Sequence, residues 1–480
     1  MRIQNLPEPL CLLVLCATWL GFTLFSIVLC GAGFLHPESY SFLPHYLSGA
    51  PLLDLIYDNR ITDWGNYQAR ELGFVFDWLD CQFIAWSVER GQPHFFSATH
   101  YVFLLLAGIA LWRIGTRHLG LDRLVAFGLV LLLWTCPTAM LYTTFYRAAK
   151  VGLLLTTLLV VWAWLNARTH REGGRGWLQV ALFGLLAVLM PMFDKQGLLF
   201  LGAAVLLLAR NAHVQRTACD RRLLVVGLLA LALAWSYQRF IGPAITSHLL
   251  GYEVNRGYTA IPFGDLASDR RFLGTVALGA PLLAFDSFRI PLGNLPAGLA
   301  LLAVWWMWRQ FAAMPAAGPR WLSPAAIFAG LILFVCAVYA AMLMLFPLML
   351  SSEHRRFFYC LPVAACWLVA AAAALGESAR RSPERRHWLA LAVGALVVGN
   401  VFALQEHRFV LRQGHYEPFV ENAARVREAL RPAALAAAGI TPAEAAALLE
   451  QAPYFRDAVP PSLREDRVYL CFLARQSRPR

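Results

Sequence analysis

The stretch from Asp58 to Gly91 holds the residues of this sequence best suited to catalysis. Asp63 precedes a run whose apolar residues recur at helical spacing, and Asp58 lies in the polar segment before it. A carboxylate can serve as the general base for an acceptor hydroxyl or amine. Each aspartate also has a structural interpretation, Asp63 as the N-cap of the helix and Asp58 in an Asx-type turn. The sequence leaves both interpretations open.

The two lysines are the next candidates for chemistry. The chain has 41 basic residues, yet Lys150 and Lys195 are its only lysines. A compact ammonium group suits a phosphate oxygen. The alternatives are lysines that reach toward lipid headgroups and a local pair of Asp194 with Lys195. The pattern favours phosphate binding over these alternatives.

A third group of candidates is the run from Ser351 to Arg356. His354, Arg355 and Arg356 follow a long apolar segment. Arginine forks bind phosphate through two parallel hydrogen bonds. The alternatives are contact with lipid headgroups and an ion pair with Glu353. This run therefore predicts a second source of cations for an anionic substrate.

The composition places these residues on a membrane protein. Of the 480 residues, 59% are hydrophobic and 15% are charged, which is too apolar for a soluble domain. The chain therefore predicts an all-α polytopic membrane protein. The net charge of +12 does not indicate nucleic acid, because the arginines cluster in short loops between apolar runs. Membrane lipids are the expected surroundings.

About eleven apolar segments are long enough to be membrane spans. The first is 10–35, a retained helix with no signal-peptide cleavage site. The others are about 98–116, 122–141, 150–166, 177–192, 197–209, 222–240, 292–308, 324–350, 357–376 and 388–405.

The loops predict the orientation. Placing the arginine-rich loops inside puts the N-terminus in the cytoplasm and the loop 36–97 outside. The apolar segment Phe272–Phe285 is short for a span, so we expect a re-entrant or interfacial segment within an outer loop 241–291. The C-terminus then lies outside.

Two regions differ from this membrane domain, 1–405. From Trp64 to Glu89 the spacing predicts interfacial helix, which we expect to lie along the membrane plane with its aromatic residues at the headgroups. The tail 406–480 predicts a small α/β domain, with helix in Ala423–Ala438, a helix start at Thr441 and a strand at Arg467–Leu473. A disulfide between Cys81 and Cys471 is left open by spacing alone.

At these residues the chain resembles the GT-C class of glycosyltransferases, in the branch of protein O-mannosyltransferases and the lipid A aminoarabinose transferase. The segment TDWGNYQAREL is similar to that branch's acidic motif followed by Tyr and Arg-Glu, and supplies Asp63, Tyr67, Arg70 and Glu71. Lys195-Gln196-Gly197 is similar to its Lys-Gly turn. The run Arg356–Pro362 is similar to its Arg-x-Tyr-x-x-x-Pro motif. Lys150 is a departure, because the branch usually has an acidic residue there.

The resemblance covers the membrane region to about residue 405 and implies a function. It implies inverting transfer of a sugar from a polyprenyl-phosphate donor to a lipid, glycan or protein acceptor at the periplasmic face of a bacterial inner membrane. Asp63, with Asp58 second, would be the catalytic base. The donor phosphate would be held by Lys195, Lys150, Arg355, Arg356, His354 and Arg70. Enzymes of this class differ in their need for a divalent metal ion, so no cofactor is assigned.

Two other functions compete with this one. A transporter or flippase for a lipid-linked sugar would also use cations at the outer side, but it needs polar residues at mid-bilayer. A non-catalytic scaffold that presents the tail 406–480 to a partner would explain the tail but not the two lysines. No Walker loop, GxGxxG motif or HExxH motif occurs in the sequence.

Overall fold

The computed structural model describes residues 7–30, 42, 45–58, 67–89, 97–140, 148–169, 174–254, 270–315, 323–345 and 353–411, with isolated residues 433, 436 and 441. No strand occurs in these ranges. The predicted helix, helix start and strand of the tail 406–480 lie outside them, apart from the end of the last helix and the isolated residues. The described part of the chain is all-α.

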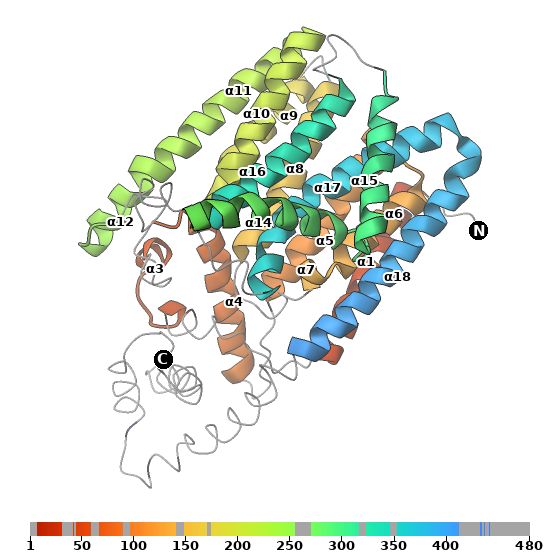
Figure 1. Ribbon diagram of the computed structural model, residues 1–480. Coiled ribbons are helices and arrows are strands. Elements are labelled where there is room, and N and C mark those ends of the chain that lie inside the picture. The colour runs from red at the N-terminus through yellow and green to blue at the C-terminus, as the bar shows by residue number, and fades with distance from the viewer. Residues whose placement is uncertain are drawn as a thin grey trace.

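The helices follow one another as α1 (Glu8–Cys30), α3 (Leu52–Tyr57), α4 (Glu71–Glu89), α5 (Ala98–Arg113), η3 (Ile114–His118), α6 (Arg123–Thr135), α7 (Pro137–Met140), α8 (Ala148–Thr169), α9 (Gly174–Phe193), α10 (Gln196–Gln215), α11 (Ala218–Ser236), η4 (Tyr237–Ile241), α12 (Gly242–Leu250), α14 (Arg270–Arg289), α15 (Ala297–Ala312), α16 (Pro324–Leu345), α17 (Glu353–Arg381), η7 (Pro383–Arg385) and α18 (Arg386–Leu411). Figure 1 shows the long helices side by side in a tilted bundle, with α14 lying across it. Both η3 and η4 are π-helical turns, and η7 is a 3₁₀ turn.

Eight of these helical stretches are long and apolar enough to cross a membrane, so the chain is a multi-pass membrane protein. This confirms the coarse sequence prediction. The stretches are Ala98–His118, Ala148–Thr169, Gly176–Phe193, Gln196–Gln215, Ala218–Leu250, Pro324–Met344, Cys360–Arg381 and Arg386–Ala403.

Three other predicted spans correspond to shorter or partly described helices. The predicted span 122–141 ends early, because α6 stops at Thr135 after 13 residues and the chain turns at Cys136 before Pro137. The predicted span 292–308 becomes α15, with 16 residues. Both are below the roughly 20 residues that cross a hydrocarbon core without help. The first predicted span, 10–35, corresponds to α1.

The predicted span 222–240 is longer in the structure. Helix continues from Ala218 to Leu250 through the π-helical turn η4, over 33 residues. At about 1.5 Å per residue this helix exceeds the ~30 Å of hydrocarbon. The outer loop predicted at 241–291 therefore starts with helix α12, and the segment Phe272–Phe285 lies within α14, which is outside the eight spans.

Polar contacts define the two ends of the bundle. At one end, α4 caps the helices that follow it, since Asp77 Oδ1 accepts a hydrogen bond from the Ala148 amide at 2.7 Å and Asp80 Oδ1 from the Thr99 amide at 3.0 Å. At the other end, Arg168 Nε lies 3.2 Å from Asp220 Oδ1. The first of these ends carries the candidate site.

Helix α4 buries two of its carboxylates and exposes part of its apolar side chains. The aspartates Asp77 and Asp80 are buried, whereas Leu79 and Trp86 are exposed. Figure 1 shows α4 running away from the bundle rather than across it, as α14 does. The prediction that this helix lies along the membrane plane stays a prediction. Asp77 and Asp80 are buried because their carboxylates satisfy the free amides at the starts of two neighbouring helices.

Candidate functional site

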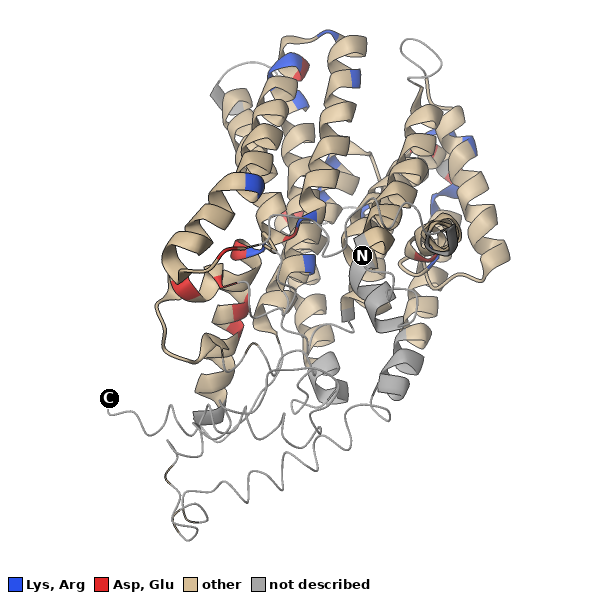
Figure 2. Cartoon of the chain, turned by 60° about the vertical axis from the view of Figure 1, so that its left-hand side comes forward, with Lys and Arg blue, Asp and Glu red and all other residues tan. Residues whose placement is uncertain are grey.

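A buried polar cluster forms where the chain leads into α4 and meets the turn between α9 and α10. Figure 2 shows acidic segments concentrated on this side of the chain, with basic segments beside them. Ala69, fully buried, has a φ of 50°, in the left-handed region that residues other than glycine rarely adopt. This conformation precedes Arg70 and Glu71, the two charged residues that the segment delivers to the cluster.

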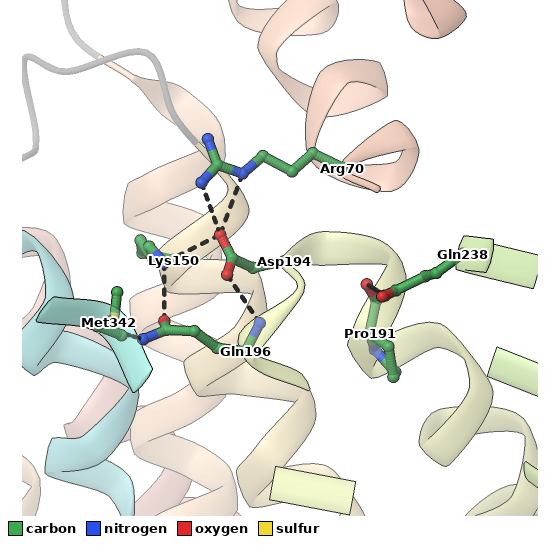
Figure 3. Close-up of polar contacts among 7 residues, drawn as sticks. All are labelled: Arg70, Lys150, Pro191, Asp194, Gln196, Gln238 and Met342. Carbon is green, nitrogen blue, oxygen red and sulfur yellow. Dashed lines mark hydrogen bonds and ion pairs between the residues drawn. The ribbon is translucent and has the colours of Figure 1, made fainter. Parts of the chain in front are cut away.

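Asp194 is the centre of the cluster (Figure 3). Its Oδ2 atom lies 2.9 Å from Lys150 Nζ and accepts a hydrogen bond from Arg70 Nε at 3.1 Å. Its Oδ1 atom accepts from the Gln196 amide at 3.0 Å. Burial alone would raise the pKa of Asp194, but the charges of Lys150 and Arg70, with the amide hydrogen bond, lower it to about 2. Asp194 is therefore ionised at neutral pH.

The turn that carries Asp194 is held from two sides. Gln196 Oε1 accepts a hydrogen bond from Lys150 Nζ at 2.7 Å, and its amide group contacts Met342 Sδ of α16. A Cβ atom on Gly197 would lie 2.6 Å from Pro191 Cα, so only glycine allows the chain to fold back this closely. The turn is therefore a fixed platform for Asp194 and Lys195.

Glu71 is the second carboxyl group of the cluster. It is buried, and its Oε1 atom accepts a hydrogen bond from the Tyr67 hydroxyl. Among the described residues none donates a hydrogen bond to Oε2, which is also buried. Burial raises the pKa of Glu71 to about 7, against the opposing effects of the Tyr67 hydrogen bond and the charge of Lys195. Glu71 can therefore gain and lose a proton near neutral pH.

Lys195 lies beside this carboxyl and is partly buried. Burial, together with the charge of Arg70, lowers the pKa of Lys195 to about 8, against the opposing effects of Asp194 and Glu71. Lys195 is a cation at neutral pH that can exchange its proton under mildly alkaline conditions.

Tyrosine hydroxyls extend from Glu71 toward α3. Tyr67 is hydrogen-bonded to Tyr237, and the Tyr237 hydroxyl lies 2.8 Å from the Tyr57 hydroxyl. Tyr237 opens the π-helical turn η4, a type of turn that is frequent at functional sites. A Cβ atom on Gly242 would lie 1.8 Å from the Tyr67 hydroxyl oxygen, so glycine makes room for this ring. Helix α3, the segment before α4 and the turn η4 thus supply one continuous series of hydroxyl groups.

Asp58 lies at the edge of this group. It is the C-cap of α3, and its Oδ1 atom accepts a hydrogen bond from the Tyr252 hydroxyl at 3.0 Å. Thr246 of α12 donates to the Tyr57 carbonyl at 3.2 Å, which joins α3 to α12. Asp58 is buried. The structure gives it Tyr252 as a partner, and the Asx-type turn considered from the sequence extends into residues outside the described ranges.

The structure brings together four of the residues predicted for the site: Arg70, Lys150 and Lys195 in the cluster and Asp58 beside it. Asp63 lies outside the described residues. His354, Arg355 and Arg356 are in the first turn of α17, where the structure describes the backbone only. Their predicted roles stay predictions.

Lys150 has a partner in the structure that the sequence did not indicate. Its side chain is 2% exposed and is committed to Asp194 and Gln196. The sequence considered a pair of Asp194 with its neighbour Lys195; the ion pair in the structure joins Asp194 to Lys150, 44 positions earlier in the sequence. This is a contact between helices α8 and α9–α10 that spacing in the sequence does not indicate.

Glu71, Asp194 and Tyr237 were not among the catalytic or phosphate-binding residues predicted from the sequence. Glu71 was named there only as part of the Tyr and Arg-Glu motif, and Asp194 only as a possible partner of Lys195. Tyr237 had no signal, because its role comes from the π-helical turn. Cys81 is a buried free thiol, and Cys471 lies outside the described residues.

In the described part of the chain no group of three or more His, Cys, Asp or Glu residues could hold a metal ion. Comparisons with protein-family models, curated proteins and solved structures found no match to this chain.

Proposed function

We propose that this chain is an inverting glycosyltransferase that moves a sugar from a polyprenyl-phosphate donor to a lipid, glycan or protein acceptor at the periplasmic face of a bacterial inner membrane. The observation that carries the proposal is the excess of cations in the buried cluster. Arg70, Lys150 and Lys195 face two carboxyl groups, and one of these, Glu71, has a pKa of about 7. A buried cluster with net positive charge is suited to an anionic headgroup.

The position of the cluster supports an enzyme that works at the membrane boundary. Lys150 lies in the first turn of α8, and Asp194 and Lys195 lie between the spans of α9 and α10. A polyprenyl-phosphate headgroup remains at that depth while its chain stays in lipid. Cations there can stabilise the charge that develops on the departing phosphate.

The two lysines have separate roles in this proposal. Lys150 neutralises Asp194 and fixes the turn, so it positions the site. Lys195 and Arg70 bind the donor phosphate, with Arg355, Arg356 and His354 as further cations. Asp63 is the proposed general base, and Asp58, bonded to Tyr252, is the second candidate.

The distribution of charge also bears on the transporter alternative. The eight spans carry Asp, Glu, Lys and Arg near their ends and not at their middle, except for Arg239, which lies in the turn η4 beside the site. A translocation path needs polar groups at mid-bilayer. Transport is therefore the weaker proposal.

The test is complementation of a deletion strain, followed by mass analysis of its surface glycolipids and periplasmic proteins. We expect Asp63→Asn and Lys195→Ala to be made at normal levels and to lose the glycan product. The matched control Arg380→Ala removes one positive charge at the opposite end of the bundle and should keep it. Undiminished glycan with Asp63→Asn and Lys195→Ala would refute the proposal. Intact product that accumulates on the cytoplasmic side would favour transport.

A further inference from the structure

Glu71 and three tyrosines form a connected path out of the buried cluster. The path runs from Glu71 to Tyr67, then to Tyr237, and ends at Tyr57. Tyr67 is 2% exposed, whereas Tyr57 is only partly buried. The series therefore leads from the interior of the cluster toward the surface.

Each tyrosine hydroxyl holds one proton and can both donate and accept a hydrogen bond. When Glu71 is ionised, Tyr67 donates to it, Tyr237 donates to Tyr67, and Tyr57 donates to Tyr237. When Glu71 is protonated, its own hydroxyl can donate to Tyr67, and every bond in the series can reverse. The series thus has two states of opposite polarity, which is the requirement for passing a proton along it.

The charged and hydroxyl groups around Glu71 influence whether its carboxyl group is ionised. Lys195 is the cation that acts on it, and Arg70 and Asp194 act on Lys195. Tyr67, Tyr237 and Tyr57 are the hydroxyls on the other side. Burial raises the pKa of Tyr67 and of Tyr57, so both hydroxyls stay neutral and carry protons without ionising.

We propose that Glu71 is the proton-holding group of the site and that Tyr67, Tyr237 and Tyr57 form its relay to water. This inference rests on the proposed function for the source of the proton. In the transfer, the acceptor O–H (or N–H) bond breaks and its oxygen or nitrogen forms the new bond to the sugar. The sugar–phosphate C–O bond breaks, and the lipid phosphate leaves with that electron pair. The proton released by the acceptor is held on the Glu71 carboxylate and then leaves through the tyrosines.

This role is distinct from that of Asp63. Asp63 is the proposed group that takes the proton directly from the acceptor, whereas Glu71 is buried and stores it. The Glu71 Oε2 atom, to which no described residue donates, is the carboxyl oxygen left to receive the proton. Loss of the relay should therefore slow turnover without weakening donor binding.

The first measurement is infrared difference spectroscopy of the full chain in lipid nanodiscs during a pH titration. We expect wild type to show a carboxylic-acid band that disappears between about pH 6 and 8. Glu71→Gln should lack that band, and Tyr237→Phe should retain it. A titrating band of equal size in Glu71→Gln would overturn the assignment of Glu71.

The second measurement is the rate at which this band responds to a rapid pH jump. Tyr237→Phe removes the central hydroxyl and leaves Glu71 in place, and we expect it to slow the response by roughly tenfold or more. Tyr339→Phe is the control, because Tyr339 is a fully buried tyrosine whose hydroxyl contacts Cys360 outside the series. An unchanged rate in Tyr237→Phe would overturn the relay.

The two proposals fail in different ways. If no glycan transfer is found but the band titrates and Tyr237→Phe slows it, the relay stands and the proposed function fails. If transfer is found, and Tyr237→Phe slows neither the response of the infrared band to the pH jump nor the turnover, the proposed function stands and the relay fails.

Discussion

Lys150 of α8 and Asp194, in the turn between α9 and α10, form an ion pair with 2.9 Å between Nζ and Oδ2. Both side chains are almost completely buried. Two charges in such a position are favourable only together, since each one alone would be a buried unpaired ion. The pair therefore joins the start of α8 to the turn between α9 and α10. It also holds Arg70, which bonds to the same oxygen atom.

Breaking this pair should destabilise the protein more than removing it altogether. We expect Lys150→Met or Asp194→Asn to lower the free energy of unfolding by about 3–5 kcal/mol, and the double variant to cost less than the sum of the two. Thermal unfolding in a mild detergent measures this, with Arg380→Ala as the surface control. Additive losses would contradict a coupled pair.

The stability of the wild-type protein should depend on the protonation of Glu71. Its folded-state pKa is raised to about 7 from 4.5 by burial, so the folded protein binds more protons than the unfolded chain between these values. This stabilisation is present at low pH and is lost as the pH rises through about 7. In the wild-type protein we expect the free energy of unfolding to fall by an amount on the order of 3 kcal/mol between about pH 5 and 8. In Glu71→Gln we expect this fall to be absent. Parallel pH profiles of wild type and variant would disprove it.

Lys195 should limit activity on the alkaline side. Its pKa is lowered to about 8, mainly by burial, so the charge that we propose for phosphate binding disappears above that pH. We expect glycan transfer to fall above about pH 8 in wild type. Lys195→Arg keeps its charge there and should move the alkaline limb upward by at least about one pH unit. An alkaline limb at the same pH in both proteins would remove Lys195 from this role.

Gly242 should tolerate no side chain, because the Tyr67 hydroxyl occupies the position where a Cβ atom of residue 242 would lie. We expect Gly242→Ala to displace Tyr67, to cost about 1–3 kcal/mol of stability, and to impair transfer. Gly274→Ala is the matched control, since nothing lies within 4 Å of its added Cβ. Equal behaviour of the two variants in unfolding and transfer assays would contradict the packing described here.

Asp80 should behave as a structural residue, although it falls with Asp63 in the predicted outer loop 36–97. It accepts hydrogen bonds from the Ser97 hydroxyl and the Thr99 amide at the start of α5. We expect Asp80→Ala to lower stability by about 1–2 kcal/mol and to leave the transfer rate per folded molecule unchanged. A lost transfer rate in a fully folded Asp80→Ala protein would place Asp80 in the chemistry.

Much of the architecture follows from the sequence, because a hydrocarbon environment demands long apolar helices with satisfied backbones. The positions of α5, α8, α9, α16, α17 and α18 agree with predicted spans to within a few residues at most ends. The sequence was less informative for α6 and for the 33-residue helix through Leu250. Apolar runs continue past a turn at Cys136 and give no sign of the π-helical turn at Tyr237.

For the candidate site too, the sequence predicted one part and the tertiary structure decided another. The rarity of lysine in the chain pointed to Lys195 and Lys150, and the resemblance of one motif pointed to Arg70. Only the tertiary structure decided which partner each one has. Lys150 meets Asp194 because α8 packs against α9, and Glu71 is buried because Tyr67 fits over Gly242. Burial and pairing depend on contacts between helices far apart in the sequence, and these contacts set the charge and the pKa of each group.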